Sequence, residues 1–198
     1  MQPAPPQAQA TVPAPAPVDP FALLARGDRR GAITALMDQH GTAVFNLCSR
    51  VLRDRVLAED VLQQVFIHAY RDIERFERRS SARTWLLRIA IHRCQDAIKA
   101  RDRQRVADDP DAIHDAVDPG RMPAEHAERS HLVRALEECL GELSDDVRAT
   151  VLLRFQSEFS YREMAGTLDA SAEALQARVA RALPALRRCL ESKGWPNG

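Results

Sequence analysis

LAEDVLQQVFIHAYRDIERFERRSSARTWLLRIAIHRCQDAIKARDRQR, residues 57–105, divides into two helical patterns around a polar break at residues 77–81. On each side of the break, apolar residues recur at steps of three and four, which is the spacing of one face of an α-helix. In the first pattern these are Leu57, Val61, Leu62, Val65, Phe66, Ala69 and Ile73. The second pattern begins at Ser80 or Ser81, each able to cap free amides, and runs to about Arg103.

A polar line runs along the second of these helices, between two apolar lines. Its members, at steps of four, three, four and four, are Arg88, His92, Gln95, Lys99 and Arg103. This spacing places positive charge and hydrogen-bonding groups on one face for about four turns. Such a face is either a solvated helix surface or a track for nucleic-acid phosphates and base edges, and the line alone leaves both interpretations open.

Trp85 lies in the first turn of the same helix, beside the 77–81 loop that contains Arg78 and Arg79. A tryptophan at such a position is most often part of the core. The alternative is a stacking platform for an unpaired base, because aromatic faces beside a basic loop hold single-stranded nucleic acid.

Charge is segregated along the chain, although 28 basic and 28 acidic residues cancel in total. Residues 21–105 hold 17 basic and 10 acidic side chains, residues 106–130 hold 2 and 7, and residues 131–198 hold 9 and 10. A basic unit, an acidic connector and a near-neutral unit imply different partners for each part. The aromatic content of 5% is typical of helical rather than β-rich structure.

The four cysteines, Cys48, Cys94, Cys139 and Cys189, are far apart and form no CxxC pair. All lie in helical patterns on or beside apolar faces, so we expect buried free thiols in a reducing compartment. No run has the length of a transmembrane helix, and the N-terminus lacks the basic patch and apolar core of a signal peptide. We therefore expect a cytoplasmic protein without membrane insertion.

The first unit is expected at residues 19–105, after a disordered Pro/Ala-rich tail at residues 1–18. Asp19–Pro20 is a helix start, with a capping side chain before a proline at the first helical position. After Gly27–Asp28 a long helix carries an apolar stripe of Ile33, Leu36, Met37, His40, Val44, Leu47 and Val51, with Leu52 beside it. We interpret His40 as a core or boundary residue, because no second metal ligand lies at helical spacing, and we expect no metal site.

Residues 106–122 are expected to form an acidic flexible linker. They include Asp108, Asp109, Asp111, Asp115 and Asp118, with Pro110, Pro119 and Gly120. One interpretation is a solvated spacer. The other is an extended anion that occupies a basic channel normally holding nucleic acid.

The second unit, residues 123–192, contains further helical patterns and precedes a tail at residues 193–198. Ser160-Tyr161-Arg162-Glu163 matches a capping box at the start of a short helix, Asp169–Ala170 marks a turn, and Ser171 can cap the last helix. The apolar positions include Leu132, Val133, Leu136, Leu140, Leu143, Val147, Val151, Leu152, Phe155, Met164, Leu168, Leu175, Val179, Leu183, Leu186 and Leu190. A short helix, a turn and a longer helix form the helix-turn-helix outline.

Together these segments resemble a bacterial RNA polymerase sigma factor of the extracytoplasmic-function (ECF) group of the sigma-70 family. AEDVLQQVF with AYRDIERF resembles the region-two helix that docks on the polymerase clamp, and SARTWLLRIAIHRCQDAIKARDRQ resembles the minus-ten helix. LSDDVRATVLLRFQSEFSYREMAGTLDASAEALQARVARAL resembles region four. The resemblance covers nearly all of residues 21–192 and implies an all-α fold, with a region-two bundle and a region-four helix-turn-helix joined by the acidic linker.

By that resemblance, Asp60, Gln63 and Gln64 lie on the polymerase-facing side of their helix, although Gln64 stands where Glu is common. The linker is expected to thread toward the RNA exit path, since its acidic charge suits a channel built for RNA phosphates. The residues implied to meet the opened minus-ten element are Arg78, Arg79, Trp85, Arg88, His92, Gln95 and Lys99. Among these, His92 stands where the family commonly has Asn.

The last helix departs further from the family pattern. Glu173-Ala174-Leu175-Gln176-Ala177-Arg178 stands where Gly-Thr-Val-Lys-Ser-Arg is usual, so hydroxyl donors and a cation are lost and Glu173 adds repulsion near phosphates. Pro184 is expected to bend the helix or break one hydrogen bond, at about 3 kcal/mol if unrelieved. The remaining candidates for the minus-thirty-five element are Ser171, Gln176, Arg178 and Arg181, and we expect weak or altered recognition.

The resulting prediction is a promoter-specificity subunit that directs core RNA polymerase to a subset of promoters, with promoter DNA and an anti-sigma factor as further partners. The alternative is a sigma-like interaction protein that binds an anti-sigma factor or polymerase and reads little DNA itself. An enzyme is not expected, because the sequence has no Ser/His/Asp spacing, Gly-rich phosphate loop or metal-ligand pair. No cofactor is expected.

Overall fold

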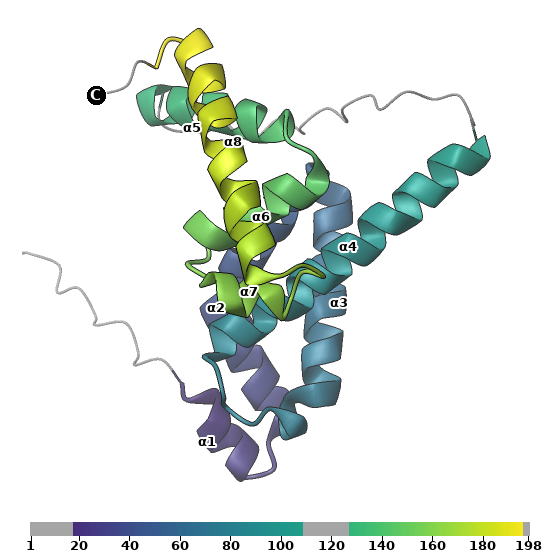
Figure 1. The fold of residues 1–198 in the computed structure, drawn as a ribbon. Helices are drawn as coiled ribbons and strands as arrows, with labels where there is room; N and C mark the ends of the chain where they lie inside the picture. Colours follow the sequence, from purple (N-terminus) through teal and green to yellow (C-terminus); the bar gives the residue numbers. More distant parts are fainter. Residues whose placement is uncertain (1–17, 109–126, 196–198) are drawn as a thin grey trace, which may run out of the picture.

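The computed structural model describes residues 18–108 and 127–195, and every regular element within those ranges is helical (Figure 1), as the sequence predicts. The elements are α1 (Pro20–Ala25), α2 (Arg29–Leu52), α3 (Arg55–Asp72), η1 (Ile73–Arg75), α4 (Ala82–Asp108), α5 (Ala127–Gly141), α6 (Asp145–Phe155), α7 (Tyr161–Ala165) and α8 (Ala172–Ser192). We call α1–α4 the N-terminal bundle and α5–α8 the C-terminal bundle.

In the N-terminal bundle, α2, α3 and α4 pack against one another, and α1 lies against α2 (Figure 1). The apolar stripes predicted from the sequence meet in the centre of this bundle, where burial of apolar surface supplies most of the stability. Its fully buried side chains include Leu36, Val44, Leu47, Leu52, Ile73, Leu86, Leu87 and Ile91.

Short polar side chains set where these helices begin. Asp19, Asp28 and Asp54 accept backbone amide hydrogen bonds of 2.9, 2.8 and 3.0 Å at the starts of α1, α2 and α3. Ser81 does the same for α4, through the amide of Thr84 at 3.0 Å, so it is the cap among the two serines that the sequence offers. Each cap satisfies a donor that the helix itself leaves unpaired.

The C-terminal bundle has the expected helix-turn-helix outline, α7 followed by the longer α8. Ser160 and Glu163 form the predicted capping box, and Ser171 accepts a 3.2 Å hydrogen bond from the Ala174 amide at the start of α8. The core of this bundle contains Leu153, Phe159, Met164, Leu168, Leu175 and Val179.

Several residues predicted on apolar helix faces are exposed instead. Met37, Phe155 and Leu183 are 45%, 57% and 44% exposed, and exposed residues of α5 are Leu132, Val133 and Leu136. Periodicity marks one side of a helix, but it does not show how far the neighbouring helix reaches. Phe155, for example, is the last residue of α6, and Leu183 directly precedes Pro184 on the exposed side of α8.

The α4 helix is longer than predicted, since it continues from Arg103 to Asp108. Its last residues, 106–108, belong to the segment that we assigned to the linker. The remainder of that segment, the N-terminal tail at residues 1–17 and the last three residues lie outside the described residues.

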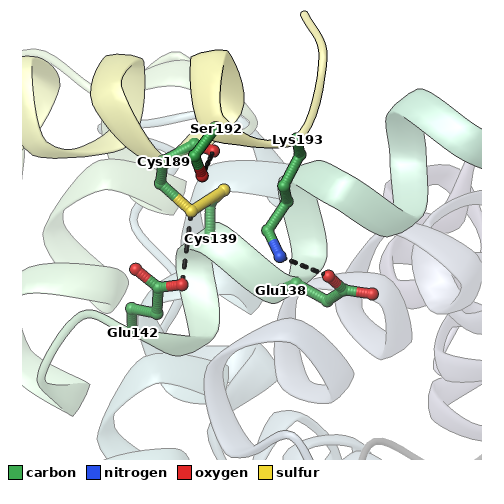
Figure 2. Close-up of a disulfide and its surroundings, with 6 residues drawn as sticks. All are labelled: Glu138, Cys139, Glu142, Cys189, Ser192 and Lys193. Atoms are coloured by element: carbon green, nitrogen blue, oxygen red, sulfur yellow. Dashed lines mark hydrogen bonds and ion pairs between the residues drawn. A yellow bond between two sulfur atoms is a disulfide. The ribbon is translucent and has the colours of Figure 1, made fainter.

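The prediction of four free cysteines is wrong for two of them. Cys139 of α5 and Cys189 of α8 form a disulfide (Figure 2), whereas Cys48 and Cys94 are free and buried as expected. A hydrogen bond with Cys48, reinforced by burial, raises the pKa of the Cys94 thiol. The disulfide was missed because its partners are 50 residues apart, and only the packing of α8 on α5 brings them together.

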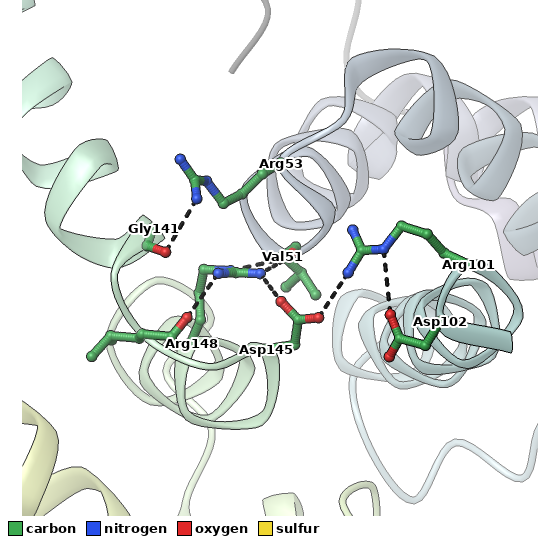
Figure 3. Close-up of polar contacts among 8 residues, drawn as sticks. Val51, Arg53, Arg101, Asp102, Gly141, Asp145 and Arg148 are labelled. Carbon is green, nitrogen blue, oxygen red and sulfur yellow. Dashed lines mark hydrogen bonds and ion pairs between the residues drawn. The ribbon is translucent and has the colours of Figure 1, made fainter. Parts of the chain in front are cut away.

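The two bundles pack against each other through a buried arginine, Arg148 of α6, which is 3% exposed. Its Nε and Nη2 atoms donate hydrogen bonds of 3.1 and 2.8 Å to the carbonyl oxygen of Val51, at the end of α2 (Figure 3). Nη1 donates to the Leu143 carbonyl at 3.0 Å, and Nη2 also pairs with the Asp145 carboxylate. The guanidinium thus satisfies groups from both bundles, as a buried charge requires.

Three further arginines of the N-terminal bundle extend this contact. Arg53 donates to the carbonyl of Gly141 at 3.1 Å, and Arg101 of α4 pairs with Asp145 at 2.9 Å (Figure 3). Near the other end of α6, Arg83 donates to the Ser157 carbonyl at 3.2 Å. Guanidinium groups bound to backbone carbonyls therefore supply much of the polar contact between the bundles.

Candidate polymerase and nucleic-acid interface

The outward face of α3 carries the three residues predicted to meet polymerase. Asp60, Gln63 and Gln64 are all exposed. On the same helix, at spacings that continue this face, Val56 and Ile67 are 71% and 51% exposed. Exposed apolar side chains next to polar ones are a common feature of protein-binding surfaces. The exposure of these two residues could have been predicted from the sequence, because neither belongs to the apolar stripe of α3.

The predicted polar line lies on α4 as expected, but its members differ in accessibility. His92 and Lys99 are exposed, whereas Arg88 and Gln95 are half-buried. Hydrogen bonds from Ser160 lower the pKa of Glu163 in α7, and the nearby charge of Arg88 lowers it further. The first position of the line, Arg88, therefore lies close to the C-terminal bundle, whereas His92, Lys99 and Arg103 are exposed.

The loop between η1 and α4 presents Arg78 and Arg79, both exposed. Arg79 forms an ion pair with Glu77 inside the loop, and Arg78 has a left-handed backbone with φ of 55°. Trp85 is half-buried against the core, and its ring stacks on Phe76 with centroids 4.8 Å apart. One face of the tryptophan is thus already covered by protein.

The four residues proposed for the minus-thirty-five element have different surroundings on α8. Gln176 and Arg181 are exposed, and Ser171 is exposed while its hydroxyl caps the helix. Arg178 is half-buried and donates a 3.2 Å hydrogen bond to the hydroxyl of Thr150 in α6. In this arrangement Arg178 supports the packing of α8 on α6.

Two other residues of α8, Glu173 and Pro184, are those expected from the sequence to weaken DNA binding. Hydrogen bonds from its own backbone amide and from Ser171 lower the pKa of Glu173, so this exposed carboxylate stays charged. The helix continues through Pro184, which removes only the hydrogen bond that the carbonyl of Ala180 would accept. Ala180 is exposed, so the carbonyl that loses this partner belongs to a residue on the solvent side of α8.

No group of three or more His, Cys, Asp or Glu side chains within residues 18–108 and 127–195 is arranged to hold a metal ion. His40 is half-buried beside α4, where burial, and then the charge of Arg83, lowers its pKa. It lies at the boundary of the core. None of the helices that the structure describes combines the length and apolar character of a membrane span.

The comparisons with known proteins agree with this arrangement of helices. The family profile of sigma-70 region 2 matches residues 36–104, and that of sigma-70 region 4 matches residues 133–186. The ECF RNA polymerase sigma factor SigX of Bacillus subtilis is 31% identical over 159 residues, which cover 79% of this chain and 82% of SigX. The chain belongs to the ECF sigma factors.

Other known proteins are similar to this chain over most of their length. The RNA polymerase sigma-H factor of Pseudomonas aeruginosa is 30% identical over 84% of this chain and 89% of its own. Among solved structures, the sigma factor RpoE of Bartonella quintana, in complex with the anti-sigma factor NepR, has a TM-score of 0.65 at 24% identity, covering 76% of this chain and 91% of RpoE. CnrH, in complex with the cytosolic domain of CnrY, has a TM-score of 0.60 at 24% identity, covering 88% and 97%.

Membership in this family identifies which sigma region each bundle contains. The N-terminal bundle contains sigma region 2, and the C-terminal bundle contains region 4. Sigma factors are transcription initiation factors without catalytic activity of their own, in agreement with the prediction that the chain is not an enzyme.

Proposed function

We propose that this chain is a promoter-specificity subunit, which binds core RNA polymerase and directs initiation to a subset of promoters. The observation that carries the proposal is the combination of sigma regions 2 and 4 in one chain, each folded as a separate helical bundle. Because sigma factors work on polymerase and promoter DNA, we place the protein in the cytoplasm. An anti-sigma factor is a further proposed partner, by analogy with the complexes that RpoE and CnrH form with NepR and CnrY.

In this proposal the outward face of α3 docks on polymerase. Asp60, Gln63 and Gln64 provide its polar centre, and exposed Val56 and Ile67 add apolar contact area. Burial of those two side chains on binding contributes favourable free energy, while the polar residues set specificity.

The loop at residues 77–81 and the exposed line on α4 are proposed to bind the opened minus-ten element. Arg78, Arg79 and Lys99 supply charge for phosphates, and His92 and Gln95 supply hydrogen-bonding groups for base edges. Arg88 joins this surface at the position nearest the C-terminal bundle. Trp85 supports this loop from the protein side, because its ring is stacked on Phe76.

Charge reversal on the exposed line tests the minus-ten assignment. Lys99→Glu is expected to reduce promoter opening by the holoenzyme about tenfold, because it replaces attraction to a phosphate with repulsion. The measurement is in vitro transcription with core polymerase on a pool of genomic promoters. Arg30→Glu, an exposed reversal on α2, is the matched control and should retain activity. Unchanged promoter opening with Lys99→Glu would contradict the proposed role of this face of α4. If the wild-type protein gave no selective initiation, the proposed function itself would be contradicted.

A second candidate function is a sigma-like interaction protein that reads little DNA. The observations that favour it are on α8, where Glu173 is charged and exposed and Arg178 is bound to Thr150. Gln176→Lys distinguishes the two functions. A DNA reader is expected to gain affinity for the minus-thirty-five element, with a steeper salt dependence, because a cation returns beside the phosphates. An interaction protein should show no change in either quantity.

A further inference from the structure

A column of three aromatic rings and one guanidinium group connects α1 to the loop before α4. The Trp85 ring of α4 stacks on Phe76, with centroids 4.8 Å apart, and Phe76 stacks on Phe21 of α1 at 5.5 Å. The guanidinium carbon of Arg78 lies 4.2 Å from the centroid of the Phe21 ring. Phe21 therefore contacts both Phe76, which directly precedes the 77–81 loop, and Arg78 within it.

Few other contacts fix the middle of this loop within the part of the chain that the structure describes. The Phe76 amide bonds to the carbonyl of Ile73 at 3.2 Å, and at the far end Ser81 caps α4. Between these points Arg78 has a left-handed backbone, with φ of 55°, which a non-glycine residue adopts only when its surroundings hold it there. The stacked ring of Phe21 is the contact that holds the Arg78 side chain.

Phe21 lies outside the segments that the sigma-70 region 2 and region 4 profiles match. The match to sigma-70 region 2 begins at residue 36, whereas α1 spans Pro20–Ala25. The α1 helix is itself firmly placed, because Asp19 caps it and its Leu23 and Leu24 pack against the core. The ring thus comes from a helix that neither region profile includes.

We propose that Phe21 is a positioning residue for promoter recognition, which orients Arg78 toward the minus-ten element; this rests on the proposed function of the loop. A guanidinium stacked on a ring keeps its planar edge of N–H donors directed outward, in a fixed orientation that a mobile arginine lacks. The group that Arg78 would bind is an unpaired base, or its phosphate, in the opened strand. Selectivity at one promoter position then depends on a residue of α1.

The test separates a positioning role from simple packing of α1. Phe21→Leu keeps apolar volume at the site but removes the aromatic face, and Phe21→Tyr keeps the face. The full chain and core polymerase transcribe a template library that is randomised across the minus-ten element. At each position, the preference ratio is the transcript yield with the preferred base divided by the yield with the other bases. We expect Phe21→Leu to reduce the ratio at one position about three- to fivefold, which corresponds to the loss of one exposed cation–π contact. Phe21→Tyr should preserve it.

Two further variants sharpen the result. Arg78→Lys keeps the charge but not the planar stack, so it should reduce the ratio at the same promoter position as Phe21→Leu. Phe45→Leu removes another arginine–ring pair of the same bundle, formed with Arg55 at 5.6 Å, and should leave every ratio unchanged. The inference is overturned if Phe21→Leu retains the wild-type ratios, or if it lowers all positions equally. Loss of selectivity by the wild type would instead contradict the proposed function itself.

Discussion

Replacing Arg148 with methionine is expected to lower the free energy of unfolding by about 3 kcal/mol and to loosen the packing of the two bundles. Methionine keeps the aliphatic stem but removes the guanidinium, so the carbonyl of Val51 (Figure 3) and that of Leu143 lose their donor. Asp145 keeps only its pairing with Arg101. Removing one partner of a buried charge network costs about 3–5 kcal/mol, because the remaining groups are left buried without a partner.

Urea unfolding of the full chain measures the first effect, and the radius of gyration from small-angle X-ray scattering measures the second. Arg154→Met is the matched control on the same helix. Arg154 donates one hydrogen bond, to the carbonyl of Phe159 at 3.1 Å, within the C-terminal bundle. We expect this control to lose about 1 kcal/mol and to keep the wild-type radius. An Arg148→Met protein with the wild-type urea midpoint would show that Arg148 does not hold the bundles together.

Reducing the Cys139–Cys189 disulfide is expected to destabilise the C-terminal bundle by about 4 kcal/mol. The disulfide closes a loop of 50 residues, and a cross-link of that span limits the conformational freedom of the unfolded chain by about this amount. After reduction, the end of α8 stays attached to α5 by the 2.6 Å ion pair between Lys193 and Glu138 (Figure 2), an exposed pair that contributes little.

Hydrogen exchange of α5 and α8 peptides, with and without dithiothreitol, measures this change locally. Protection of both helices should fall on reduction, while α2 and α3 keep theirs. The Cys139→Ser/Cys189→Ser double variant is the control, since its exchange should not respond to dithiothreitol. Equal protection of α8 in the oxidised and reduced wild type would contradict the prediction.

The helices and their starting points could be predicted because the forces that define them act over a few residues. Asp28 and Ser160 cap helices whose first amides lie within three residues, so the sequence contains both partners. The apolar stripe of α3 likewise follows from spacing within one segment, and Val61 and Val65 are buried as expected. Phe155 was placed wrongly because its burial depends on where α6 ends against its neighbours.

The surfaces proposed for polymerase and DNA follow partly from the spacing of residues and partly from a family resemblance. Spacing placed His92 and Lys99 on one exposed face of α4, and the structure has them there. It could not show that Arg88 lies near Glu163, or that Arg178 binds Thr150, because each partner belongs to a different helix.

By itself, the sequence determined an all-helical chain with a basic first unit, a helix-turn-helix in the second and most of the apolar stripes that α2, α3 and α4 bury. Only the tertiary structure decided that Arg148 binds the carbonyl of Val51, that Cys139 meets Cys189, and that Phe21 stacks beneath Arg78. The physical reason is the separation in sequence between the residues that interact. Helix periodicity and capping are set by residues within one or two turns, whereas these contacts join segments 50 or more residues apart, which approach only when complete helices pack.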